Sequence, residues 1–167
     1  MSPQLVTQGT PGFDTPVHPG FAKALQSVWT QLQTRLTTNN KPLWVTGHSL
    51  GGAIATLLAY QLPERVAALY TFGSPCVGTE EFVNAFNEKG LKPKTYRYLH
   101  GNDAVAKALE KFTPQYHHVG QLYPLDAGVR RGLLAQGLNI VFGSTLGINL
   151  LDHPPILYSY ECWNAIP

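Results

Sequence analysis

The stretch KPLWVTGHSLGGAIATLLA, residues 41–59, passes from a strand-like run through a turn to a helix former. Its apolar start predicts a short buried strand at 43–46, and its Ala- and Leu-rich end predicts a helix at 51–62, which Pro63 ends. The break between them, GHSLG at 47–51, fits G-x-S-x-G, a sharp turn that lifts a serine off the end of a strand. This stretch therefore predicts a strand–turn–helix unit that exposes Ser49.

Two glycines flank this serine for a steric reason. A residue at such a turn is strained, and the residues two before and two after it crowd together, so Gly47 and Gly51 are expected to leave room by lacking a Cβ. The helix that follows directs its free N–H groups and positive dipole end toward charge that develops in acyl transfer. We therefore expect Ser49 to be a nucleophile and the backbone N–H of Leu50 to be an oxyanion donor.

Further strands and helices alternate along the rest of the chain. Strands are expected at 66–72, 95–100 and 117–123, and helices at 21–36, at 79–89 with Thr79 as its cap, and after His153. This alternation predicts an α/β fold with a mostly parallel sheet and helices on both faces. We expect one domain over 1–167, with an irregular lead-in at 1–16 that is rich in Pro and Gly.

Composition excludes some classes of partner and location. Charged residues make up 13%, and the 12 basic residues are scattered, so no nucleic-acid partner is expected. Cys76 and Cys162 match neither a metal site nor a redox pair, and we expect free thiols in a reduced compartment. Because residues 1–8 lack the pattern of a signal peptide, a cytoplasmic location is expected.

An uncharged segment, 132–151, follows two arginines. Nine of its 20 residues are Gly or polar, whereas a membrane span needs about 20 mostly apolar residues. The favoured interpretation of 130–151 is a helical insertion packed over the sheet. The alternatives are a lid-like segment that touches a lipid surface transiently, and a true span.

The serine needs a base that is oriented by a carboxylate, in the chain order Ser, acid, His. Five of the six histidines fit poorly: His18 precedes the serine, the side chain of His48 diverges from it, His100 precedes the best acid, and 117–118 open a strand. His153 remains, in a loop that enters the last helix. Buried, hydrogen-bonded roles are expected for 117–118.

Three aspartates are candidates for the acid. Asp103 directly follows a predicted strand, at the sheet edge where Ser49 emerges, and is favoured. Asp126 is the alternative, and Asp152 is expected to cap the last helix.

Six ordered motifs over residues 17–163 resemble those of the class 3 lipases, the fungal triacylglycerol lipase-like branch of the α/β-hydrolase fold. They are VHPGF at 17–21, VTGHSLGGA at 45–53, TFGSP and VG within 71–78, NDAV at 102–105, HVG at 118–120, and DH at 152–153 with Tyr158. The resemblance implies Ser49 as nucleophile, Asp103 as orienting acid and His153 as general base. It also implies hydrolysis of acyl-lipid esters, without a cofactor or metal.

One family feature is missing from residues 1–16. Relatives carry upstream strands and an F-R-G-[TS] segment that supplies the second half of the oxyanion hole, and nothing here resembles it. The domain is therefore expected to be N-terminally truncated. A sheet without these strands leaves an edge exposed, which favours a homo-oligomer formed through that edge.

These patterns predict a serine ester hydrolase, a lipase or carboxylesterase, that acts on medium or long acyl chains. A truncated, non-catalytic domain that binds lipid or a partner is the alternative from another class. Acyl transfer to an alcohol other than water would use the same residues.

Overall fold

The computed structural model describes residues 12–38, 40–107, 113–125 and 152–164. Their sheet has the order β1-β2-β3-β4, and every neighbouring pair is parallel. The strands are β1 (Leu43–His48), β2 (Val66–Phe72), β3 (Thr95–His100) and β4 (Gln121–Leu125). The α-helices are α1 (Pro19–Thr37), α2 (Leu50–Gln61), α3 (Glu80–Glu88) and α7 (Pro155–Asn164), and the 3-10 turns η1 (Pro63–Arg65) and η2 (Lys92–Lys94) precede β2 and β3.

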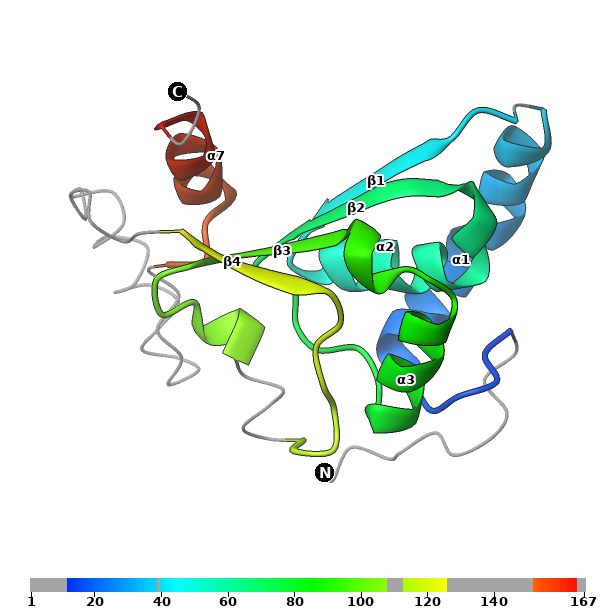
Figure 1. Ribbon diagram of the computed structural model, residues 1–167, viewed down its shortest axis with the longest axis horizontal. Coiled ribbons are helices and arrows are strands. Elements are labelled where there is room, and N and C mark those ends of the chain that lie inside the picture. The colour runs from blue at the N-terminus through cyan, green and yellow to red at the C-terminus, as the bar shows by residue number, and fades with distance from the viewer. Residues whose placement is uncertain (1–11, 39, 108–112, 126–151, 165–167) are drawn as a thin grey trace.

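Helices lie on both faces of this sheet (Figure 1). Because the strands follow one another in order and parallel crossovers are right-handed, α2 and α3 fall on the same face. Helix α2 packs on β1 and β2, and α1 packs behind α2. Helix α7 lies on the opposite face, against β3 and β4. The expected α/β architecture is confirmed.

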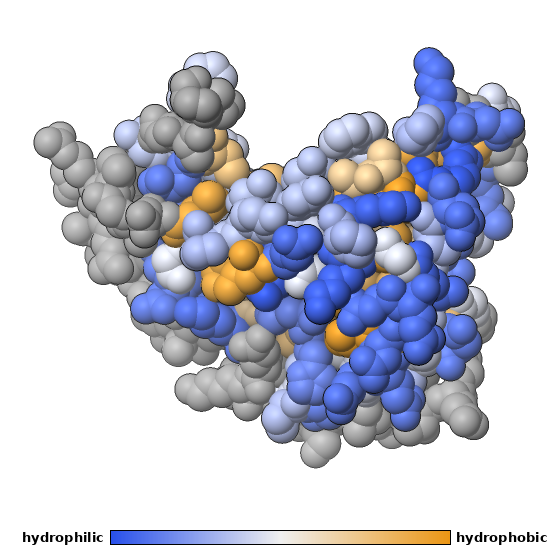
Figure 2. Space-filling model, in the orientation of Figure 1, coloured by the Kyte–Doolittle hydropathy of each residue, from blue (hydrophilic) through white to orange (hydrophobic). Residues whose placement is uncertain are grey.

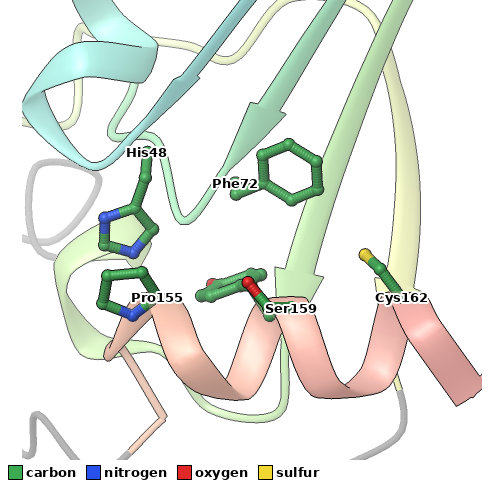
Figure 3. Close-up of a pocket in the computed structure, with 6 residues that line it drawn as sticks. His48, Phe72, Pro155, Ser159 and Cys162 are labelled. Carbon is green, nitrogen blue, oxygen red and sulfur yellow. The ribbon is translucent and has the colours of Figure 1, made fainter.

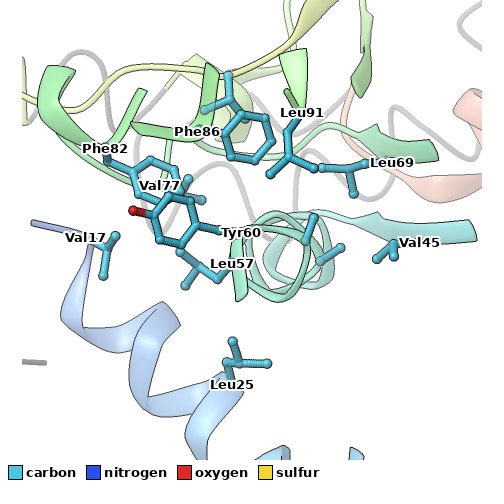
Figure 4. Close-up of a cluster of buried hydrophobic side chains, with 14 of the residues drawn as sticks. Val17, Leu25, Val45, Leu57, Tyr60, Leu69, Val77, Phe82, Phe86 and Leu91 are labelled. Carbon is cyan, nitrogen blue, oxygen red and sulfur yellow. The ribbon is translucent and has the colours of Figure 1, made fainter. Parts of the chain in front are cut away.

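The hydrophobic core fills the space between the sheet and the layer of α1, α2 and α3 (Figure 4). Phe82, Phe86, Leu57 and Leu69 are completely buried there. Each such side chain contributes about 1.5–3 kcal/mol to folding by leaving water. Small residues of α2 let the helix approach the strands closely, which fixes the position of its N-terminus against the end of β1.

Among the described residues, α7 covers only part of its face of the sheet. Trp44, Tyr70 and Tyr96 form a stacked row across β1, β2 and β3, with ring centroids 6.0 and 5.0 Å apart. Trp44 is 71% exposed at the β1 end of this row. The space-filling view shows a hollow between α7 and the side of the molecule near α1, with apolar patches inside it (Figure 2).

One local expectation is wrong, and a second is confirmed only in part. The strand expected at 117–123 runs instead over Gln121–Leu125, because His117 donates its N–H to the Gly78 carbonyl and Gly120 makes a turn with φ +76°. Helix α3 begins after Thr79 as expected, but the Thr79 hydroxyl makes no capping hydrogen bond.

Several expectations fall outside the described residues. These are the insertion or lid at 130–151 and most of the lead-in at 1–16, whose described part, 12–16, forms no helix or strand. Among the residues that the structure describes, no helix has the length and apolar character needed to cross a membrane. The single domain over 1–167 stays a prediction.

Candidate active site

The turn between β1 and α2 holds Ser49 in a strained conformation. Its φ of 55° and ψ of −127° make it the one non-glycine residue with positive φ in the described part of the chain. The Ser49 N–H donates to the Phe72 carbonyl at 2.9 Å, which ties the turn to the end of β2. Strain of this kind persists only where surrounding contacts enforce it, and it is common at functional sites.

The glycines around the turn have different roles from those expected. A Cβ at Gly47 would lie 2.2 Å from the Gly51 carbonyl oxygen, so residues 47 and 51 do crowd together. A Cβ at Gly51, however, would meet nothing within 4 Å, whereas one at Gly52 would lie 2.7 Å from the Cβ of Ser74. The turn therefore has no room for a Cβ at Gly47 and Gly52, and the expectation for Gly51 is wrong.

Ser49, His153 and Asp103 lie in one hydrogen-bonded line. The Ser49 Oγ lies 2.8 Å from Nε2 of His153, and Nδ1 of the same ring lies 2.9 and 3.0 Å from the two carboxylate oxygens of Asp103. Because a carboxylate only accepts, Nδ1 carries the proton of the neutral ring and leaves Nε2 free to accept from the serine hydroxyl. The structure thus brings the three predicted residues together.

Asp103 is fully buried at the carboxyl end of β3. Its Oδ1 accepts from the N–H groups of Val105 and Ala106 at 2.9 and 3.2 Å, and its Oδ2 accepts from the Tyr158 hydroxyl at 2.5 Å. Burial raises the pKa of Asp103, but the hydrogen bonds from His153, Tyr158 and the Ala106 N–H, together with the charge of His153, outweigh burial, so that this pKa is lowered. The acid is therefore ionised near neutral pH and able to orient the imidazole.

Of the two other aspartates considered, the structure describes only Asp152. Asp126 lies outside the described residues, and both oxygens of Asp103 already face His153. Asp152 does not cap α7 as expected: its Oδ2 accepts from the N–H of Asn102 at 2.9 Å. The last helix begins at Pro155. The Asp152 carboxylate points toward the loop after β3 and does not cap the N–H groups of this helix.

Three other histidines lie outside the hydrogen-bonded line of Ser49, His153 and Asp103. His118 bonds through Nε2 to the Ala106 carbonyl at 3.2 Å, and burial lowers its pKa to about 4, so a structural role fits it. His117 is exposed, and its backbone pairs with that of Gly78, so the buried role expected for it is wrong. The ring of His48 bonds to the carbonyl oxygen of His153 at 2.8 Å, a contact between residues 105 positions apart that no sequence motif indicates.

The N-terminus of α2 offers one donor for an oxyanion. The Leu50 N–H directly follows Ser49, and the structure gives it no hydrogen-bond partner among the described residues. No group of three or more metal-binding side chains occurs in the part of the chain that the structure describes.

Comparison with known proteins points to one family. The model of the class 3 lipases matches residues 2–112 of this chain. The chain belongs to the class 3 lipase family.

Relatives and solved structures agree with this assignment. A secreted mono- and diacylglycerol lipase of Fusarium solani is 33% identical over 153 residues, which cover 82% of this chain and 45% of that protein. A secreted mono- and diacylglycerol lipase of Penicillium cyclopium is 38% identical over 87 residues, 50% of this chain and 27% of that protein. The triacylglyceride lipase structure of Rhizomucor miehei superposes with a TM-score of 0.60 and 30% identity, over 73% of this chain and 50% of that one. This class 3 lipase chain thus spans half or less of the length of each of these relatives.

The expected cytoplasmic location is contradicted by these relatives, because both mono- and diacylglycerol lipases are named as secreted. That expectation depended on the first residues of the chain, and a chain that spans less than half of its relatives carries no information there. In the described structure of this class 3 lipase, neither Cys76, which is buried, nor Cys162, which is partly exposed, forms a disulfide bond.

A cavity of about 220 Å³ adjoins the site between α7 and the ends of β1 and β2 (Figure 3). It is mostly apolar, and its lining residues are His48, Phe72, Pro155, Tyr158, Ser159 and Cys162. Four of these residues belong to α7, which follows His153, and Ser49 is not among them. The cavity of this class 3 lipase therefore lies beside α7 and not directly at the Ser49 hydroxyl.

Proposed function

We propose that this class 3 lipase chain is a serine ester hydrolase that cleaves carboxylic esters of acyl lipids through an acyl-enzyme on Ser49. The observation that carries the proposal is the continuous hydrogen-bonded line from Ser49 Oγ through His153 to Asp103, with a strained serine at the N-terminus of α2. Family membership supports the same reaction.

In the first half of the reaction, Ser49 Oγ attacks the acyl carbonyl carbon while Nε2 of His153 takes the hydroxyl proton. Asp103 keeps Nδ1 protonated and stabilises the imidazolium that forms. The carbonyl oxygen becomes negative and accepts a hydrogen bond from the Leu50 N–H, next to the positive end of α2. His153 then returns its proton to the leaving alcohol, and the acyl group stays on Ser49.

In the second half, water replaces the alcohol. His153 takes a proton from the water, the hydroxide attacks the acyl-enzyme, and the collapse of the intermediate releases a carboxylic acid and restores the Ser49 hydroxyl. No step needs a metal or an organic cofactor. Removal of one oxyanion donor typically lowers the rate by about 10²- to 10³-fold, and the Leu50 N–H is expected to contribute to this extent.

The substrates that we propose are glycerides with medium or long acyl chains, and the place of action is outside the cell. The relatives from Fusarium solani and Penicillium cyclopium are named as secreted mono- and diacylglycerol lipases, which supports both points. Apolar patches in the hollow of the molecule fit an acyl chain better than a charged acyl group (Figure 2).

The test combines covalent labelling with turnover. A fluorophosphonate probe should label the wild-type chain and leave Ser49→Ala unlabelled, and p-nitrophenyl butyrate and octanoate should be hydrolysed only by the wild type. Loss of the nucleophile is expected to lower kcat by about 10⁶-fold. Far-UV circular dichroism checks that both proteins are folded.

The outcomes separate the alternatives. A folded wild-type chain that neither reacts with the probe nor releases p-nitrophenol would contradict the hydrolase and favour a non-catalytic lipid-binding domain. Ester exchange in added alcohol at the expense of acid release would show an acyltransferase that uses the same residues.

We also propose that the chain self-associates through the edge of its sheet. In the described sheet, β1 has a neighbouring strand only on its β2 side, and an exposed tryptophan lies on it. Unpaired edges of this kind favour pairing with another chain.

A further inference from the structure

His153, the base of the proposed site, lies in the short loop 152–154 that directly precedes helix α7. Its ring must meet groups from two other loops, since Ser49 follows β1 and Asp103 follows β3. Two side chains that take no part in the proposed chemistry hold this loop, one on each side.

Asp152 ties the loop to the segment that carries the acid. It is 4% exposed, and its Oδ2 accepts from the N–H of Asn102 at 2.9 Å. Asp152 directly precedes the base, and Asn102 directly precedes Asp103, so this single bond joins the two loops beside their functional residues. The other oxygen, Oδ1, lies 3.8 Å from Nδ1 of the buried His100, and this nitrogen atom makes no hydrogen bond within the described structure.

His48 ties the same loop to the nucleophile turn. Its Nε2–H donates to the carbonyl oxygen of His153 at 2.8 Å, and it directly precedes Ser49. Burial lowers the pKa of His48, so the ring is neutral near pH 7 and carries its proton on the nitrogen that faces the carbonyl. Its ring also lies against those of His153 and Tyr158, with centroid distances of 4.6 and 5.5 Å, which fixes its orientation.

We propose that Asp152 and His48 are positioning residues, which clamp the loop of His153 between the acid loop and the nucleophile turn and so set the distance from Nε2 to Ser49 Oγ. This inference rests on the proposed ester hydrolysis. In the chain, His153 is 50 residues from Asp103 and 104 residues from Ser49. Local backbone geometry therefore cannot position His153 relative to these two residues. A displacement of about 1 Å at such a site is enough to cost about 10²-fold in rate.

The first test compares Asp152→Ala with Asp152→Asn. The amide oxygen of Asn can still accept from the Asn102 N–H, whereas Ala cannot. Asp152→Ala should lower kcat for p-nitrophenyl butyrate by about 10- to 100-fold with little change in KM. Asp152→Asn should keep at least half of the wild-type kcat with an unmoved pH profile. If Asp152 acted through its charge, Asp152→Asn would lower kcat as much as Asp152→Ala and the pH profile of kcat would shift. This result would overturn the proposal.

The second test compares His48→Phe with His48→Gln. Phe keeps a ring in the apolar surroundings but has no donor, and Gln offers an N–H to the His153 carbonyl. The kcat should fall in His48→Phe by about 10-fold or more and be partly restored in His48→Gln. Because both clamps act on one loop, the double variant Asp152→Ala with His48→Phe should lose less than the product of the two single losses.

A structural readout keeps the test independent of turnover. The downfield proton resonance of the His153 Nδ1–H that donates to Asp103 should be present in the wild type and in Asp152→Asn, and broadened or lost in Asp152→Ala and His48→Phe. Asp14→Ala serves as the matched control, because its carboxylate also accepts a hydrogen bond, from the Tyr60 hydroxyl, at a distance from the site. This control should change the melting temperature alone and leave kcat and the resonance as they are.

The outcomes distinguish this inference from the proposed function. A wild-type chain without Ser49-dependent turnover would contradict the hydrolase, and the resonance would still decide whether the clamp holds the ring. An active wild type together with an Asp152→Ala variant of equal kcat and unchanged resonance would overturn the clamp and leave the hydrolase standing.

Discussion

Asp103 is a carboxylate that stays charged although it is completely buried. The Tyr158 hydroxyl, from the middle of α7, is one of the donors that keep it charged. Because the folded-state pKa of Asp103 is lowered from 3.8, its ionisation stabilises the fold above that value, and this stabilisation is lost as the pH falls through the lowered pKa.

We predict that Tyr158→Phe destabilises the protein more at pH 7 than at pH 3. Removal of the hydroxyl raises the folded-state pKa of Asp103 and so reduces a contribution that exists only where the carboxylate is ionised. Thermal melts of the wild type and the variant at both pH values measure the difference. Tyr160→Phe is the matched control, since Tyr160 lies on the same helix with 48% of its surface exposed and should show no pH-dependent difference. Equal losses at pH 3 and pH 7 for Tyr158→Phe would contradict the prediction.

The residues of the site could be predicted from the sequence where chemistry and chain order restrict the choice. Ser49 stands in a recognisable turn, and the order Ser, acid, His leaves few candidates for its partners. The part played by Asp152 could not be predicted, because its acceptor role depends on how closely the loop after β3 approaches the start of α7. Adjacency to His153 was the available signal, but a carboxylate just before a helix equally suggests a cap.

At the scale of elements, the strand–turn–helix unit shows how sequence pattern and steric need differ. The motif contains Gly47 and Gly51, but the space around the turn is restricted at Gly47 and Gly52. Which Cβ would collide depends on what packs against α2, and the neighbour in this case, Ser74, comes from a distant part of the chain. The start of β4 was missed for a similar reason, since the backbone pairing of His117 with Gly78 lies outside the sheet.

We predict opposite effects of alanine at the three glycines. Gly51→Ala should raise the free energy of unfolding by about 0.5–1 kcal/mol, because its Cβ meets nothing and alanine favours the helix. Gly47→Ala and Gly52→Ala should lower it by more than about 1 kcal/mol, because their Cβ atoms would lie 2.2 and 2.7 Å from neighbouring atoms. Urea unfolding followed by circular dichroism measures all three. A Gly51→Ala variant as unstable as Gly47→Ala would show that the turn restricts both motif positions alike.

At the scale of the whole molecule, the described sheet is covered unequally. One face is packed against α2 and its neighbouring helices, whereas α7 covers only the part of the other face near β3 and β4 (Figure 1). The alternation of strands and helices was sufficient to predict the layers. It could not predict how much of each face is covered, because that depends on contacts between distant segments.

The exposed side of β1 leads to the prediction that two copies of the chain pair at this edge. In a two-fold symmetric dimer, the two β1 strands would run antiparallel and each Trp44, 71% exposed, would be shielded by the partner. Light scattering after size-exclusion chromatography should show a wild-type mass that rises with concentration toward twice 18.3 kDa. Trp44→Lys should stay monomeric, because a lysine on an edge strand opposes pairing. Trp163→Lys is the matched control: this tryptophan is 76% exposed but lies on α7, so the variant should associate like the wild type. A wild-type chain that is monomeric at every concentration, or a Trp163→Lys variant that dissociates like Trp44→Lys, would contradict pairing through β1.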